Sequence, residues 1–132
     1  MAQPRVDNRA VVTVRGEDLA GSVLGRVVGM LAARAHCPID RLDDALLVTD
    51  AVAAHAGVHG IDGSVCVTIS TEADGLALVV GCLREGGADG LMSDAQLPGV
   101  GNVLEHMADE VSPGPSENGG GEQLLIRLAF AS

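Results

Sequence analysis

The stretch that decides the fold is SVCVTISTEADGLALVVGCL, residues 64–83. It contains two runs of apolar and β-branched residues, 64–70 and 76–83, which favour extended strands. Between them, Asp74-Gly75 is a strong signal for a tight hairpin turn, because both residue types tolerate a positive φ. The two runs are therefore expected to pair as neighbouring antiparallel strands.

On the N-terminal side, the sequence predicts a strand followed by a long helix. The segment AVVTVR, residues 10–15, alternates as a short strand does. A helix is expected from about residue 17 to 35, with an apolar stripe at helical spacing formed by Leu19, Val23, Val27, Met30 and Leu31, and with Arg26 and Arg34 off that stripe. Three glycines spaced four apart weaken this helix and allow another element to approach closely: Gly21, Gly25 and Gly29.

A second helix is expected from about residue 40 to 56. Pro38 interrupts the chain before it, and the side chain of Asp40 can cap its first turn. Within this helix Asp50 is a single acid among apolar residues, which is costly unless the carboxylate is solvated or bound. One turn later the chain has Ala54, which adds no second polar group. Asp50 therefore belongs either to a ligand site or to a solvated helix surface.

The C-terminal half is predicted to contain one helix and one strand. Residues 84–101 are rich in glycine and are expected to form a loop, as is SPGPSENGGGE, residues 112–122. Between these loops, VGNVLEHMADEV, residues 100–111, places apolar residues on one side of a helix. The segment EQLLIRLAF, residues 122–130, is expected to be the last strand.

This order of elements predicts an α/β fold. Two helices followed by a hairpin indicate a two-layer α/β sandwich, in which three helices cover one face of a mixed sheet. The chain has no internal repeat, and its 132 residues, 47% of them apolar, fit one globular domain. A single domain is therefore expected over residues 1–132, with its core at about 10–130.

The composition argues against several classes of function. A net charge of −10 disfavours contact with nucleic-acid phosphates, and one Phe with no Trp or Tyr leaves no platform for stacking bases. No apolar run reaches the ~18 residues of a membrane span, and the N-terminus has no apolar signal core, so a cytoplasmic protein without membrane contact is expected. The widely spaced Cys37, Cys66 and Cys82 do not indicate a disulfide framework.

Four segments occur in an informative order. DDALLVTDAV, residues 43–52, resembles a family helix that reads Leu-Ala-Val-Ser-Glu-Ala-Val, with Asp50 at the acidic position. GLALVVGCLREGG, residues 75–87, lies where that family has Asp-x-Gly-x-Gly, and LPGVGNVLEHMADEV, residues 97–111, resembles its Gly-x-Gly-Leu helix. GGGEQLLIRLAF, residues 119–130, falls at its last strand. Together they resemble the histidine-kinase-type ATPase (GHKL or Bergerat) fold, and most closely the small bacterial anti-sigma-factor serine kinases.

The resemblance implies a nucleotide site that is degenerate in this chain. The family's Mg²⁺-binding Asn corresponds to Ala54, which has no oxygen ligand to offer. The family's adenine-binding Asp falls at Cys82, or at Gly81 or Leu83 in a shifted alignment, and none of these is a carboxylate. Asp50 keeps the place of the catalytic acid in a shortened form. The glycines that would approach a phosphate are kept in part, at Gly86, Gly87, Gly99 and Gly101.

The function implied by the resemblance is regulation through protein binding, without ATP turnover and without a metal site. The partner is expected to be a sigma factor or an anti-sigma-factor antagonist of the STAS type. By resemblance, the first helix is the partner and dimer surface, where Glu17, Asp18 and Arg26 are the available charges. Two alternatives stay open: an active serine kinase that uses ATP and Mg²⁺, and a scaffold domain of another signalling pathway.

Overall fold

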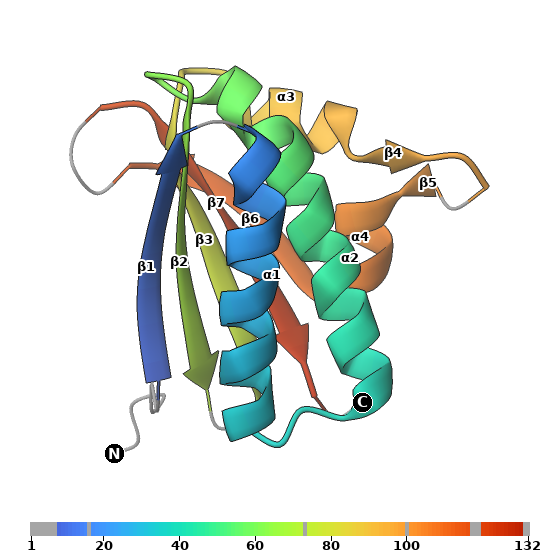
Figure 1. Ribbon diagram of the computed structural model, residues 1–132. Coiled ribbons are helices and arrows are strands. Elements are labelled where there is room, and N and C mark those ends of the chain that lie inside the picture. Colours follow the sequence, from blue (N-terminus) through green and yellow to red (C-terminus); the bar gives the residue numbers. More distant parts are fainter. Residues whose placement is uncertain (1–7, 16, 73, 100, 117–119, 131–132) are drawn as a thin grey trace, which may run out of the picture.

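The structure, a computed structural model, consists of a five-stranded sheet covered by helices (Figure 1). It describes residues 8–15, 17–72, 74–99, 101–116 and 120–130. The sheet strands are β1 (Asn8–Arg15), β2 (Ser64–Glu72), β3 (Gly75–Leu83), β6 (Glu110–Pro115) and β7 (Glu122–Ala129). The helices are α1 (Glu17–Arg34), α2 (Ile39–His55), the short 3-10 helix η1 (Ala56–His59), α3 (Gly87–Asp94) and α4 (Val103–Met107). A small hairpin pairs β4 (Gln96–Leu97) with β5 (Gly101–Asn102).

The sheet has the strand order β1-β2-β3-β7-β6. In the described part of the chain all four of its pairings are antiparallel, so the α/β class is confirmed but the expected mixed sheet is wrong. The reason is the pair of helices between β1 and β2. A single helix would return the chain to the start of β1 and make β2 parallel to it, whereas α1 and α2 together bring it back to the other end.

The hairpin and the two long helices predicted from the sequence are confirmed. Strands β2 and β3 pair antiparallel from Cys66 opposite Gly81 to Glu72 opposite Gly75. Helices α1 and α2 begin and end within one residue or two of the expected positions. Of the glycines in α1, Gly21 approaches α2, where an added Cβ would lie 3.9 Å from the Cβ of Ala53.

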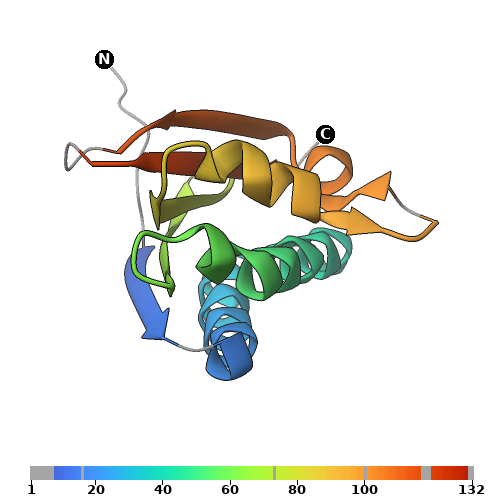
Figure 2. The same ribbon diagram turned by 90° about the horizontal axis from the view of Figure 1, so that it is seen from above.

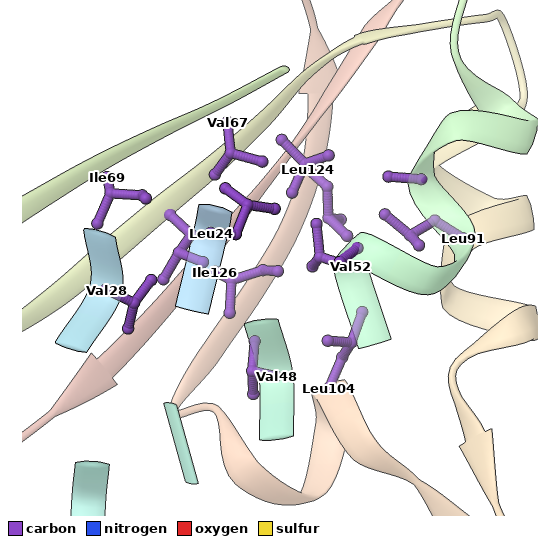
Figure 3. Close-up of a cluster of buried hydrophobic side chains, with 14 of the residues drawn as sticks. Leu24, Val28, Val48, Val52, Val67, Ile69, Leu91, Leu104, Leu124 and Ile126 are labelled. Atoms are coloured by element: carbon purple, nitrogen blue, oxygen red, sulfur yellow. The ribbon is translucent and has the colours of Figure 1, made fainter. Parts of the chain in front are cut away.

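The hydrophobic core lies between the sheet and the helices. Figure 2 shows α1 and α2 on the same side of the sheet, and Figure 3 shows the side chains that meet there. Alternation along β2 places Val65, Val67 and Ile69 in this core, while the residues between them face the open side of the sheet. The other elements contribute Leu24 and Val28 from α1, Val48 and Val52 from α2, Leu91 from α3, Leu104 from α4, and Leu124 and Ile126 from β7.

The region after β3 differs most from the expectation. The glycine-rich segment 84–101 is not a continuous loop, because it contains α3 and the hairpin of β4 and β5. The helix expected over 100–111 is limited to α4, and Val111 lies in strand β6. Residues Pro113 and Pro115 are tolerated in β6 because it is an edge strand, where a missing N–H removes no bond to a further strand.

Helix length and polarity bear on the membrane question. Within the described residues, every helix is too short or too polar to cross a membrane. The longest of them, α1, has 18 residues, and glycine and arginine residues make it less apolar.

Candidate functional site

Asp50 and Ala54 line one small cavity. Both lie on α2, one helical turn apart, and so face the same way, as their spacing predicts. The cavity has a volume of about 250 Å³ and lies between α2 and the segment 95–103. Its walls are formed by Leu47, Asp50, Ala51, Ala54, His55, Ala95, Gln96, Leu97 and Val103.

The side chain of Asn102 makes two hydrogen bonds that fix the segment opposite α2 in the cavity wall. Its side-chain nitrogen donates to the carbonyl oxygen of Met92 at 2.7 Å, and its side-chain oxygen accepts from the N–H of Glu105 at 3.1 Å. The N–H of Val103 donates to the carbonyl oxygen of Ala95 at 2.8 Å, which closes the base of the hairpin. Asn102 was not expected at the site, although Asn followed three residues later by Glu is a recognised sign of a helix N-terminus.

Gly99 and Gly101, expected to approach a phosphate, lie in the hairpin beside the cavity. Their φ angles are +81° and +89°, in the left-handed region that favours glycine. An added Cβ at Gly101 would also lie 3.1 Å from Nε2 of His106. Local backbone geometry is therefore sufficient to explain both glycines.

The chemistry of the cavity is mainly apolar. Among the described residues of its walls, only Asp50, His55 and Gln96 bring polar side chains, and Asp50 is exposed, so water can solvate its charge. Ala54 contributes a methyl group where a metal would need an oxygen ligand. In the part of the chain that the structure describes, no three His, Cys, Asp or Glu side chains are arranged to hold a metal ion. A ligand here would be held by apolar contact and one carboxylate.

Gly86 and Gly87, also expected to approach a phosphate, lie at the start of α3, where the backbone already binds a carboxylate. The N–H of Gly86 donates to Oε2 of Glu122 at 3.0 Å, and the N–H of Ala88 donates to Oε1 at 3.1 Å. These two bonds lower the pKa of Glu122 below its usual value. An anion bound at these amides would have to displace Glu122.

Gly87 has a packing role at the same turn. It is buried, and an added Cβ would lie 2.9 Å from the carbonyl oxygen of His59 and 3.1 Å from the Cβ of Leu83. Glycine lets α3 approach η1 and β3 this closely. The structure thus provides a structural reason for Gly87 that involves no ligand.

Cys82 lies away from Asp50. It lines a second cavity on the open face of the sheet, and the two cavities share no described residue. Its neighbour Leu83 is in the hydrophobic core at 1% exposure, and Gly81 lines the same open-face cavity as Cys82. None of the three aligned positions therefore contributes to the walls of the cavity beside Asp50.

The outer face of α1 exposes three large apolar side chains. Leu19 is 61% exposed, Val23 is 36% exposed and Met30 is 53% exposed. Their spacing places them on one side of the helix, together with the exposed Arg26. The opposite side supplies the core with Ala20, Leu24, Val28, Leu31 and Ala32.

These positions correct one detail of the expected partner surface. Arg26 lies within the exposed apolar stripe, because positions 23, 26 and 30 are neighbours on a helix, and it was wrongly expected to lie off that stripe. Arg26 remains available to a partner. The side chains of Glu17 and Asp18, the other two charges expected there, lie outside the described residues.

Comparison with known proteins adds no relative. The sequence matches no protein-family model, and a search of curated proteins finds no match. The resemblance to the histidine-kinase-type ATPase fold therefore stays a prediction. The described structure establishes an α/β fold in which Asp50 and Ala54 share a small cavity and α1 exposes Leu19, Val23 and Met30.

Proposed function

We propose that the chain is a regulatory protein-binding domain, similar to an anti-sigma factor, that acts without ATP turnover. The observation that carries this proposal is the outer face of α1. Leu19, Val23 and Met30 expose large apolar groups on one side of a helix whose opposite side is buried in the core. Gathered apolar exposure of this kind marks protein interaction sites more strongly than scattered exposed residues do.

The cavity beside Asp50 supports a role other than phosphoryl transfer. That chemistry depends on metal ions and on precise positioning of phosphates. Ala54 offers no metal ligand, and the amides of Gly86 and Ala88 are engaged by Glu122. A chain that has the cavity but lacks a metal ligand and free amides for phosphate is consistent with a fold used for binding.

The proposed partner is a sigma factor or a STAS-domain antagonist. This choice rests on the resemblance to anti-sigma-factor kinases. The net charge of −10 suits a partner with a basic face, because such a charge accelerates encounter with opposite charge. The attraction should weaken as salt is added, since screening limits its range to ~8 Å at physiological ionic strength.

The test measures binding of the purified chain to sigma factors and STAS proteins of the same cell, without nucleotide. Leu19→Asp and Met30→Asp should each weaken binding by about tenfold or more, because each introduces a charge into a desolvated contact. Val11→Asp is the matched control, since Val11 is 68% exposed but lies on β1. Equal losses for all three variants, or no binding to any of these proteins, would contradict the proposed partner surface or partner class.

The active-kinase alternative is favoured by one observation, the placement of Asp50 on a cavity wall. A site with micromolar Kd would raise the free energy of unfolding by roughly 4 kcal/mol at millimolar ATP. We expect almost no thermal shift with ATP and Mg²⁺, and we expect Asp50→Ala to bind partners as the unchanged chain does. A clear Mg²⁺-dependent shift that Asp50→Ala removes would support the kinase instead.

The same face of α1 also permits self-association. Sedimentation of the free chain tests this directly. A dimer that Met30→Asp dissociates, and that Val11→Asp leaves intact, would assign the α1 face to a homodimer rather than to a heterologous partner.

A further inference from the structure

Two cysteines from neighbouring strands meet on the open face of the sheet. Cys66 lies on β2 and Cys82 on β3, and both are free and half-buried. Both line a cavity of about 270 Å³, and most of its other walls come from outward-facing residues of the sheet. In the register of the two strands Cys66 lies opposite Gly81, the residue next to Cys82, so the two cysteines occupy adjacent positions of the sheet.

A bulge in β3 turns Cys82 towards Cys66. Side chains alternate along a regular strand, so Cys82 would face the core as Val80 does. Between Val80 and Leu83, however, β3 has one residue more than the facing segment of β7, and Cys82 has a φ of +56°. Leu83 consequently takes the core position, and Cys82 joins Cys66 on the open face.

This backbone conformation is unusual for cysteine. A positive φ costs free energy in any residue with a Cβ, and such conformations concentrate at functional sites. Here it places a second sulfur beside the first. We propose that Cys66 and Cys82 form a redox-active pair that closes to a reversible disulfide when a peroxide oxidises the protein.

The reaction balances with hydrogen peroxide as the oxidant. The Cys66 sulfur attacks one peroxide oxygen, the O–O bond breaks, and the products are a Cys66 sulfenic acid and one water. The Cys82 sulfur then attacks the sulfenic sulfur, the S–O bond breaks, and the hydroxide leaves with the Cys82 proton as a second water. Two thiols and one peroxide thus give one disulfide and two waters.

The raised pKa of Cys82 favours this order. The hydrogen bond to Cys66, together with burial, raises the pKa of Cys82 to about 11. The raised pKa leaves Cys82 with very little thiolate at neutral pH. The thiolate is the reactive form of cysteine, so Cys66 is assigned as the attacking thiol and Cys82 as the resolving one.

The first test treats the full chain with hydrogen peroxide, blocks free thiols with N-ethylmaleimide and measures the intact mass. The expected product is a monomer that has lost two hydrogen atoms and carries one maleimide on Cys37, and dithiothreitol should then release two free thiols from it. Digestion with trypsin and a Glu-specific protease separates peptides 42–72 and 73–84, which should appear cross-linked. Three alkylated thiols, a cross-link to Cys37, or irreversible sulfinic acid instead of the disulfide would overturn the proposal.

The second test separates the two roles and does not depend on the proposed partner binding. In Cys82→Ser, peroxide should leave a Cys66 sulfenic acid that dimedone labels, because the resolving thiol is gone. Cys66→Ser should give no dimedone adduct at Cys82. Cys37→Ser is the matched control and should form the disulfide at the same rate as the unchanged chain. Equal dimedone labelling of the two single variants, or a slower rate in Cys37→Ser, would refute the assignment.

Discussion

Arg41 joins the start of α2 to the ends of α4 and β7, and replacing it by alanine should destabilise the fold. Its Nε donates to the carbonyl oxygen of Ala129 at 2.8 Å, and its Nη1 donates to the carbonyl oxygen of Met107 at 3.2 Å. The guanidinium also contacts Oδ2 of Asp44 at 2.7 Å and Oδ2 of Asp109 at 2.6 Å. One side chain thus connects three segments that are distant in the sequence.

The magnitude follows from these bonds and their exposure. The Arg41 side chain is 22% exposed, Asp44 is 29% exposed and Asp109 is 55% exposed. Each of the two carbonyl bonds is worth about 1 kcal/mol, since folding exchanges bonds with water for bonds within the protein. The two ion pairs are partly solvated and together add about 1 kcal/mol. Arg41→Ala should therefore lower the free energy of unfolding by about 3 kcal/mol.

Urea unfolding followed by circular dichroism measures this effect. The midpoint should fall while the slope stays unchanged, because the surface exposed on unfolding is nearly the same. Arg34→Ala is the matched control, since Arg34 is exposed near the end of α1, and its effect should stay within about 0.5 kcal/mol. If Arg41→Ala costs no more than Arg34→Ala, water replaces the four contacts and the reasoning is refuted.

Three further predictions address other elements. Gly25→Ala should raise the free energy of unfolding by about 0.5–1 kcal/mol, because an added Cβ meets nothing within 4 Å and stiffens α1. Gly75→Ala should lower the free energy of unfolding, because its Cβ would lie 2.6 Å from the carbonyl oxygen of Leu128. Urea midpoints measure both changes. Leu24→Ala should cost about 2–5 kcal/mol in the same assay, since Leu24 is fully buried. Glu122 has a lowered pKa in the folded state, so the stabilisation from its carboxylate is present above the ordinary pKa and is lost as the pH falls. Glu122→Gln should therefore unfold at a lower urea concentration than the unchanged chain at pH 7, and this difference should be smaller at pH 3. An equal difference at the two pH values would contradict this.

The elements that the sequence predicted well are those fixed by local signals. The hairpin of β2 and β3 follows from two β-branched runs and Asp74-Gly75, which act within 20 residues. Helices α1 and α2 follow from their apolar spacing and from Pro38 between them. The order of two helices followed by a hairpin indicates two layers, so the α/β layers could be predicted as well, although α1 buries a different apolar stripe from the expected one.

The elements that were mispredicted depend on distant contacts. Helix α3 begins at a glycine pair in a glycine-rich segment, and the carboxylate that binds its first amides belongs to Glu122, more than 30 residues later. Strand β6 contains Pro113 and Pro115, and only its edge position makes them compatible with a sheet. No local pattern contains either fact.

The candidate site also has one feature that the sequence could predict and one that it could not. The shared orientation of Asp50 and Ala54 follows from helical spacing and could be predicted. The location of Cys82 could not, because one extra residue in β3 reverses the face on which every later side chain of that strand lies. The sequence likewise gives no sign that Cys66 has a partner, since the bulge is defined by the register with β7.

Helix α1 shows why its outer face requires an explanation. Two apolar stripes at helical spacing run along it, and the sequence favoured Leu19, Val23, Val27, Met30 and Leu31. The structure buries Ala20, Leu24, Val28, Leu31 and Ala32 instead, because alanine lets α1 approach the sheet and α2 closely. A helix at the surface of a globular domain is expected to carry polar groups on its outer side, as α1 does with the exposed Arg26. Leu19 and Met30 are large, apolar and more than half exposed, and this exposure is the reason that we propose a binding partner at α1.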